Sequence, residues 1–210
     1  MISMTFEKEL WENGVQLIAC CDEVGRGCLF GPVVAAAVIL EPYEVIEGVR
    51  DSKKLSEKKR NLYYEQIMER AVAVGLGIVS ADIIDQINIK QASREAMARA
   101  VKDLKTPWGV PVTPESLLID AEIIDLNIPQ KAVTHGEDHV HGIAAASIVA
   151  KVTRDRMCQD WHHTYPEYGL DRHKGYGTKL HRDALMSYGP TPMHRKSFIR
   201  KIMLSSEGTP

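Results

Sequence analysis

The chain has 210 residues, of which 44% are hydrophobic and 26% charged, and this is typical of one globular domain with a sizeable core. No apolar run is long enough to span a bilayer, and residues 1–14 are polar and acidic, unlike a secretory signal. The four cysteines have no zinc-like spacing, and two of them are neighbours. These features argue against a membrane-spanning protein and a disulfide scaffold, so we expect a cytoplasmic monomer with free thiols.

The net charge of −2 hides an uneven distribution along the chain. Residues 1–150 carry 15 Lys and Arg against 22 Asp and Glu, whereas residues 151–201 carry 11 against 5. A basic C-terminal quarter is what a polyanion-binding surface needs, although a solvated helical face has a similar composition. The overall charge therefore does not exclude a nucleic acid partner.

Strand and helix patterns alternate along the chain. The predicted strands, which are rich in Val, Ile, Ala and Leu, cover residues 15–22, 30–40, 72–80, 116–120 and 129–134. The predicted helices cover residues 57–72, 82–105 and 141–155, with Ser56 as a good N-cap for the first. Loops and helices follow from residue 161. This mixed order predicts an α/β layer fold.

Carboxylates end two of the predicted strands. Asp22 and Glu23 close the first strand, Asp120 closes the fourth, and Glu137 and Asp138 stand at the start of a helix. Ligands bind at strand ends in α/β sheets, and carboxylates gathered there repel one another unless cations neutralise them. Their all-oxygen donors suit Mg²⁺ or Mn²⁺. Two such ions about 4 Å apart would activate water and stabilise the leaving oxygen in phosphodiester cleavage.

A short glycine loop follows the first pair of carboxylates. Gly25 and Gly27 permit positive φ and a close approach of a ligand to the backbone, while Arg26 offers a planar fork to phosphate. The alternative is a tight hairpin with a surface salt bridge. The two carboxylates and the glycine loop are adjacent at the end of one strand. We therefore favour a phosphate-binding loop, with a divalent cation bridging the bound phosphate and the carboxylates.

Six motifs occur along the chain and read DEVGRG at 22–27, DSKKLS at 51–56, LLID at 117–120, IAAASIVAKVTRD at 143–155, HKGYGT at 173–178 and HRKSF at 194–198. Through them the chain resembles the ribonuclease HII family from residue 16 to residue 198. The resemblance implies a ribonuclease H-like mixed β-sheet flanked by helices, with residues 1–160 as the catalytic core. Residues 161–210 would form a helical, basic extension of the same domain.

The resemblance also implies an activity. Members of the family are endonucleases that cut the RNA strand of RNA–DNA hybrids. They also incise duplex DNA 5′ to embedded ribonucleotides and leave a 3′-hydroxyl and a 5′-phosphate. The metal roles of the family carry over to Asp22, Glu23 and Asp120, and a gap-free alignment adds Glu137 as the fourth acid. These four residues would hold two divalent cations, Mg²⁺ or Mn²⁺.

Further residues resemble the substrate contacts of the family. Gly25, Arg26 and Gly27 match the loop that contacts the ribose 2′-hydroxyl, the group that separates RNA from DNA. Tyr176 matches the tyrosine that packs against the sugar at the RNA–DNA junction, although a lone tyrosine is equally often a packed aromatic. The residues that we expect to contact phosphate are Lys53, Lys54, Arg172 and Lys174. For the two lysines the alternative is a solvated turn.

The chain departs from the family pattern at the fourth acid. Glu137 stands where the family usually has Asp, and glutamate there resembles the sister family, ribonuclease HIII. That family carries an additional domain before its first catalytic strand, whereas 21 residues precede Asp22 here, so ribonuclease HII is favoured. Asp138 is the alternative ligand if the alignment shifts by one residue. Otherwise we expect Asp138 to cap the helix that follows.

Three other interpretations remain. A DNA-specific nuclease or resolvase of the same fold would use similar acids but would have no reason for the Gly-Arg-Gly loop. A non-catalytic hybrid-binding module has no need for carboxylates facing a polyanion, since they would weaken binding. Ser147 and Lys151 share a helix face and could form a nucleophile and its base, but we favour a helix-packing serine.

Overall fold

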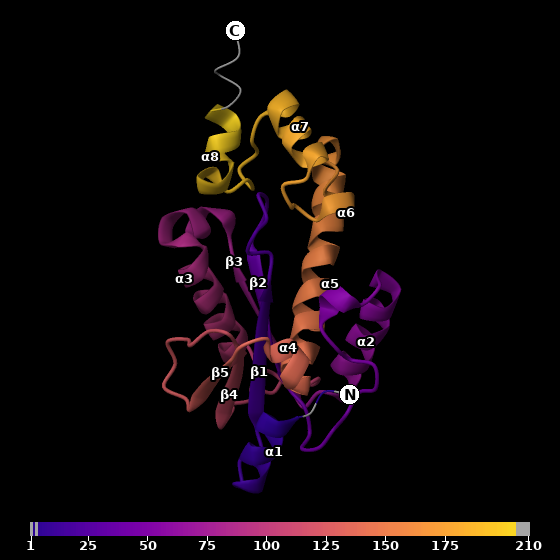
Figure 1. The fold of residues 1–210 in the computed structure, drawn as a ribbon, viewed down its shortest axis with the longest axis vertical. Coiled ribbons are helices and arrows are strands. Elements are labelled where there is room, and N and C mark those ends of the chain that lie inside the picture. The colour runs from indigo at the N-terminus through magenta and orange to yellow at the C-terminus, as the bar shows by residue number, and fades with distance from the viewer. Residues whose placement is uncertain (1, 3, 205–210) are drawn as a thin grey trace.

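The computed structural model describes residues 2 and 4–204, which form a five-stranded mixed sheet with helices on both faces (Figure 1). The order of the strands across the sheet is β3-β2-β1-β4-β5. Their bounds are β1 Ile18–Val24, β2 Val33–Ile39, β3 Ala73–Val79, β4 Ser116–Asp120 and β5 Gln130–Val133. The predicted α/β fold with a mixed sheet is confirmed.

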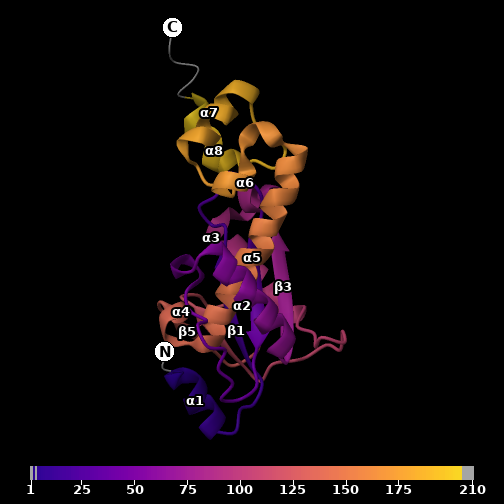
Figure 2. The same ribbon diagram turned by 90° about the vertical axis from the view of Figure 1, so that its right-hand side faces the viewer.

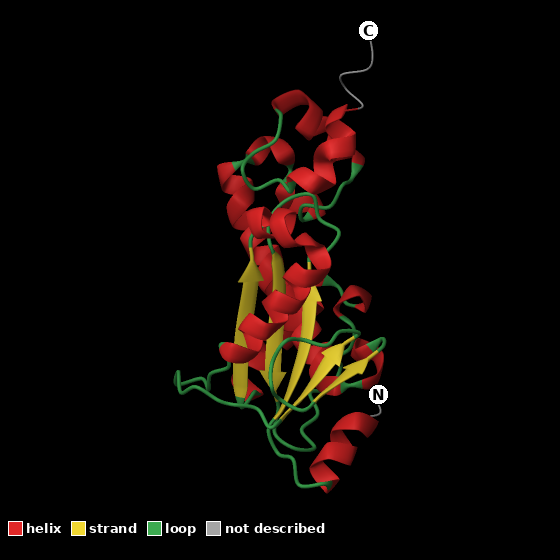
Figure 3. Ribbon diagram, turned by 90° about the vertical axis from the view of Figure 1, so that its left-hand side faces the viewer, coloured by secondary structure: helices red, strands yellow, loops and turns green. Residues whose placement is uncertain are grey.

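Strand β1 lies in the middle of the sheet, antiparallel to β2 and parallel to β4. β2 also pairs antiparallel with β3, and β4 pairs parallel with β5, so the sheet changes from antiparallel to parallel at β1 (Figure 3). β2 is buried at every position, as its continuous apolar sequence predicts. Because β1 and β4 are parallel, their carboxyl ends reach the same edge of the sheet.

The helices account for most of the remaining chain. Their bounds are α1 Thr5–Glu12, α2 Glu57–Arg70, α3 Ala81–Lys102, α4 Gly136–His139, α5 His141–Thr164, α6 Leu170–His173, α7 Lys179–Tyr188 and α8 Lys196–Leu204. The hydroxyl of Ser56 accepts the N–H of Lys59 at 3.4 Å, so the predicted cap of α2 is confirmed. Helix α1 was not among the predicted elements.

The two long helices cover opposite faces of the sheet (Figure 1). α3 packs on β2 and β3, and a Cβ at Gly77 of β3 would lie 1.8 Å from the carbonyl oxygen of Ala96 in α3. Glycine therefore lets the helix backbone approach the strand. α5 packs on β1 and β2 through small side chains, including the buried Ala144 and Ala145, and α2 packs on α5. The two helices and the sheet make the main core.

Helix α5 continues without a break through residues 160 and 161, where we expected the core to meet the extension. Its far end carries α6 and α7, which lie with α8 at one end of the molecule (Figure 2). A small core of Phe30, Tyr168, Leu170 and Ala184 joins these helices to the loop after β1. Residues 205–210 of the expected extension lie outside the described residues. Within the described residues, no helix is long and apolar enough to cross a membrane.

Two segments differ from the prediction. The first strand begins at Ile18 rather than at residue 15 and runs to Val24, so Asp22 and Glu23 lie inside it. α3 contains a break at Asn88, whose φ of 65° is left-handed. The Asn88 side chain accepts the N–H groups of Lys90 and Gln91, and this caps the second part of the helix. All four cysteines are buried free thiols, as expected.

Candidate active site

Asp22 and Asp120 lie where the parallel pairing of β1 with β4 ends. The register pairs Cys21 with Ile119 immediately before them, so the two carboxylates lie beside each other at the edge of the sheet. Burial is the largest cause that raises the pKa of Asp22 well above its ordinary 3.8, and the negative charges of Glu23 and Asp120 raise it further. A site with this electrostatics favours protons or cations.

Glu137 lies on the short helix α4 and faces Asp120. Burial is the largest cause that raises the pKa of Asp120, and the neighbouring carboxylate of Glu137 raises it further. The N–H of Gly136 donates to Oδ1 of Asp120 at 2.8 Å, so the start of α4 is tied to the end of β4. Lys53 places its ammonium 3.5 Å from Oε1 of Glu137. The structure therefore brings the predicted fourth acid to the strand-end carboxylates.

Glu23 lies next to Asp22 in β1 and contacts Arg26 of the glycine loop at 3.0 Å. Burial raises its pKa, although the guanidinium of Arg26 opposes this rise. Arg26 also lies 3.8 Å from Glu122, a buried carboxylate that Arg94 of α3 contacts at 2.8 Å. The sequence analysis missed Glu122 and Arg94. The only sequence signal for Glu122 is its position two residues after the end of a strand.

Two buried carboxylate oxygens of the site have no hydrogen-bond partner within the described part of the chain. They are Oε2 of Glu23 and Oε2 of Glu137. A buried acceptor without a donor is costly, so such an atom in a native structure points to a ligand, an ion or water. Over residues 2 and 4–204, no three His, Cys, Asp or Glu side chains are already arranged around one common ion.

Asp138 has a different place from the one we expected. Helix α4 begins at Gly136 with His135 as its N-cap, and the helix predicted from residue 141, α5, has Val140 as its N-cap; among the described residues no side chain caps either helix. The prediction that Asp138 caps the helix that follows is therefore wrong, because Asp138 lies inside the first turn of α4 and points outward. There its half-exposed carboxylate accepts from Lys54 at 2.5 Å, which keeps the pKa of Asp138 below its usual range. Asp138 and Lys54 form a surface pair beside the buried acids.

Buried arginines fix the backbone of the glycine loop. Arg195 donates to the carbonyls of Gly25, Arg26 and Gly31 at 2.7, 2.7 and 2.9 Å. Gly25 has φ 94°, and a Cβ there would meet Nε of Arg154 at 2.3 Å, so only glycine fits. Arg154 and Arg195 are fully buried. Both lie in motifs that the sequence analysis quoted, but it assigned them no role because their partners are far away in the chain.

Tyr176 lies against the same loop from the C-terminal helices. It forms an isolated bridge with Cys28, and a Cβ at Gly27 would lie 3.9 Å from its ring. The N–H of Leu29 donates to the carbonyl of Gly175 at 2.9 Å, which reinforces this junction. Tyr176 is 40% exposed. The structure thus brings the expected junction tyrosine and the expected 2′-hydroxyl loop together, with the tyrosine partly open to solvent.

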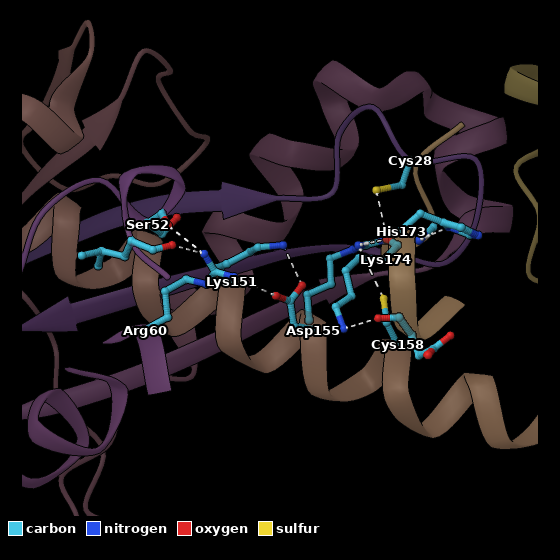
Figure 4. Close-up of polar contacts among 12 residues, drawn as sticks. Cys28, Ser52, Arg60, Lys151, Asp155, Cys158, His173 and Lys174 are labelled. Atoms are coloured by element: carbon cyan, nitrogen blue, oxygen red, sulfur yellow. Dashed lines mark hydrogen bonds and ion pairs between the residues drawn. The ribbon is translucent and has the colours of Figure 1, made fainter. Parts of the chain in front are cut away.

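The remaining basic residues lie on two sides of the site. Lys53 and Lys54 lie beside α4, whereas Arg172 and Lys174 lie on and just after α6. Arg172 is exposed. The ammonium of Lys174 donates to the carbonyl of Asp171 at 2.6 Å, and the backbone carbonyl of Lys174 accepts from Arg154 at 2.7 Å (Figure 4). Lys174 therefore also anchors the backbone next to Tyr176.

No hydrogen bond joins the side chains of Ser147 and Lys151. Lys151 pairs with Asp155 at 2.7 Å (Figure 4). The hydroxyl of Ser147 lies 2.9 Å from that of Ser52. The Ser147 hydroxyl also lowers the pKa of Asp22, against the larger effect of burial. The geometry does not form the nucleophile and base considered above. Ser147 instead links α5 to Ser52.

This fold and its strand-end carboxylates define the ribonuclease H-like class of proteins. The ribonuclease H2 from Pyrococcus horikoshii OT3 matches 91% of this chain and 99% of its own with a TM-score of 0.75 and 22% identity. Bst-RNase HIII, solved in complex with Mn²⁺, matches 92% of this chain and 71% of its own with a TM-score of 0.67 and 18% identity. These likenesses confirm the fold.

Sequence comparison gives the family. The ribonuclease HII from Alkaliphilus oremlandii (strain OhILAs) is 58% identical over 203 residues, which are 97% of this chain and 100% of the relative. The family model of ribonuclease HII matches residues 19–201. The chain belongs to the ribonuclease HII family, as its motifs predicted. It is a metal-dependent ribonuclease H that acts on RNA–DNA hybrids.

Proposed function

We propose that this enzyme also incises duplex DNA 5′ to embedded ribonucleotides, leaving a 3′-hydroxyl and a 5′-phosphate. The observation that carries the proposal is the position of the glycine loop, whose backbone begins two residues after Glu23 and is fixed by Arg195. A rigid backbone beside the carboxylates can contact a single 2′-hydroxyl at the cleavage site and so distinguish a ribonucleotide from a deoxyribonucleotide. A single ribonucleotide would then be enough for recognition.

We further propose that Asp22, Glu23, Asp120 and Glu137 hold two divalent cations, Mg²⁺ or Mn²⁺. Three observations fit these ions: the four donors are all oxygen, burial raises the pKa of three of the acids, and Glu23 and Glu137 each keep a buried oxygen that has no donor among the described residues. When bound, two such ions activate water and stabilise the leaving oxygen of a phosphodiester. The protein contributes a preorganised acid cluster whose charge the cations offset.

The other residues of the site would bind and orient the nucleic acid. We assign Tyr176 to the sugar at the RNA–DNA junction, because its exposed ring lies beside Gly27. The residues assigned to phosphates are Arg26, Lys53, Lys54, Arg172 and Lys174. In this proposal the basic extension, residues 161–210, covers the duplex while residues 1–160 perform the chemistry, and the enzyme acts as a monomer.

Three duplexes of identical sequence test the proposed function. The first is all DNA, the second has one ribonucleotide and the third has four consecutive ribonucleotides in the same strand. We expect cleavage of the second and third duplexes, with a 3′-hydroxyl product 5′ to the ribonucleotide in the second, and no cleavage of the first. Cleavage of the third duplex alone would overturn incision at single ribonucleotides and would leave the hybrid activity intact.

A further inference from the structure

Three buried histidines lie in the C-terminal part, and the proposed mechanism does not use them. His173 ends α6, His181 lies on α7, and His194 precedes α8. His181 is fully buried and His194 is 2% exposed. A buried imidazole needs a partner for each ring nitrogen, and in its neutral form one nitrogen donates while the other accepts. The partners of these rings therefore fix their tautomers.

His181 and His194 form a chain that ends on Tyr176. Nδ1 of His181 lies 3.0 Å from the carbonyl oxygen of Tyr176, and a carbonyl can only accept, so Nδ1 carries the proton. Nε2 of His181 must then accept from Nε2 of His194, which lies 3.1 Å away. Nδ1 of His194 in turn accepts the N–H of Thr191 at 3.0 Å. All four nitrogens are satisfied when both rings are neutral.

The surroundings favour this neutral state. His194 packs edge-on against Phe30 with 4.9 Å between ring centroids, and Phe30 and His194 also form a backbone bridge. Burial lowers the pKa of His181 and of His194 to about 4. His173 stacks on His181 at 4.5 Å and accepts the N–H of Gly175 through Nδ1 at 3.3 Å. The hydrogen-bond chain of His181 and His194 thus holds the carbonyl of Tyr176, and the stacked ring of His173 holds the N–H of the preceding Gly175.

We infer that His181 and His194 are positioning residues for Tyr176, whose carbonyl they hold so that its ring stays beside Gly27. This inference rests on the proposed role of Tyr176 at the RNA–DNA junction. Neither histidine touches the substrate. Their effect is on selectivity. A displaced Tyr176 packs less well against the sugar at a lone ribonucleotide, whereas cleavage within continuous RNA is still possible.

Nitrogen NMR of the wild-type imidazoles at pH 7 tests the chain without any substitution. We expect His181 as the neutral tautomer with the proton on Nδ1 and His194 as the neutral tautomer with the proton on Nε2. A charged ring, or the proton of His181 on Nε2, would overturn the hydrogen-bond chain. His163, an exposed residue on α5, is the internal control.

A double-mutant cycle tests the effect on selectivity. We measure kcat/KM for a duplex with one ribonucleotide and for a continuous hybrid in His181→Leu, Tyr176→Ala and the double variant. The ratio of interest is kcat/KM for the single ribonucleotide divided by kcat/KM for the continuous hybrid. His181→Leu should lower this ratio about 5-fold, the effect of one lost hydrogen bond. It should cause no further loss in the Tyr176→Ala background. His181→Asn should restore much of the ratio, because its amide nitrogen can donate to the carbonyl of Tyr176. His163→Leu should leave the ratio unchanged.

The outcomes separate the two proposals. If Tyr176→Ala does not change the ratio, the junction role fails, and the inference about the histidines fails with it. If Tyr176→Ala changes the ratio but His181→Leu does not, or if the two losses add, only the positioning role is overturned. Should His181→Leu not fold, the same ratio is compared between His181→Asn and His194→Leu. His181→Asn keeps a donor to Tyr176 and should keep much of the ratio, whereas His194→Leu leaves His181 without its partner and should lower it. Equal ratios in the two variants would overturn the positioning role.

Discussion

Arg195 and Gly25 lie 170 positions apart in the chain, yet Nη2 of Arg195 donates to the Gly25 carbonyl at 2.7 Å. The same guanidinium donates to the carbonyls of Arg26 and Gly31. Burial lowers the pKa of Arg195 to about 10, which still leaves it charged at neutral pH. The C-terminal part therefore determines the shape of the loop that follows the first two carboxylates. The proposed recognition of the substrate by this loop therefore depends on a contact that only the folded chain makes.

Arg195→Lys should disturb this loop although it keeps the charge. An ammonium cannot span three carbonyls as the planar guanidinium does. Each lost charged hydrogen bond costs about 1.5–3 kcal/mol, so the melting temperature should fall by about 5 °C or more. Calorimetry and hybrid cleavage measure the two effects. Arg200→Lys, at an exposed position of α8, is the matched control. An Arg195→Lys variant with the melting temperature and turnover of the wild type would contradict this role of Arg195.

Glu137 and Asp138 are neighbours with different expected roles. Glu137→Gln should lower turnover about 10²-fold or more, since it removes a charge from the acid cluster. Asp138→Asn should leave turnover near wild type, because it weakens only an exposed pair with Lys54. Steady-state cleavage of an RNA–DNA hybrid compares the two variants. An inactive, folded Asp138→Asn with an active Glu137→Gln would make Asp138 the ligand.

Tyr176→Ala should reduce cleavage at a lone ribonucleotide by about 10-fold while it reduces cleavage within continuous RNA less. The physical reason is the loss of stacking of an exposed aromatic face against the nucleotide at the junction, which is worth about 1–3 kcal/mol. Parallel kinetics on the two substrates measure the difference. Equal losses on both would mean that Tyr176 serves only to pack against the loop.

Stability without divalent cations should depend on pH through Asp22. Its folded pKa lies above its ordinary 3.8, so the folded state binds the proton more tightly than the unfolded state. The contribution of Asp22 is full below pH 3.8 and is lost as the pH rises through the folded pKa. In EDTA, Asp22→Asn should therefore raise the melting temperature at pH 8 but not at pH 3.5. A variant that melts below wild type at pH 8 would contradict the raised pKa.

The strands and main helices could be predicted from the sequence because their apolar patterns are local. Asp22 and Asp120 could be placed together because each comes at the end of a buried apolar run, and the two runs form neighbouring parallel strands. The break at Asn88 could not, since its side chain stabilises a left-handed turn inside an otherwise helical pattern. The roles of Glu122 and Arg195 depend on partners brought near by tertiary packing. For the same reason the outward direction of Asp138 was missed.

Titration of the protein with Mn²⁺ by calorimetry tests most directly whether the strand-end carboxylates hold divalent cations. We compare wild type with Asp120→Asn and with Asp138→Asn, a substitution of similar size at the surface pair. Asp120→Asn should lose most of the Mn²⁺ affinity and its cleavage activity while still binding hybrid, and Asp138→Asn should titrate as the wild type does. Equal Mn²⁺ affinity in the wild type and in folded Asp120→Asn would contradict the assignment.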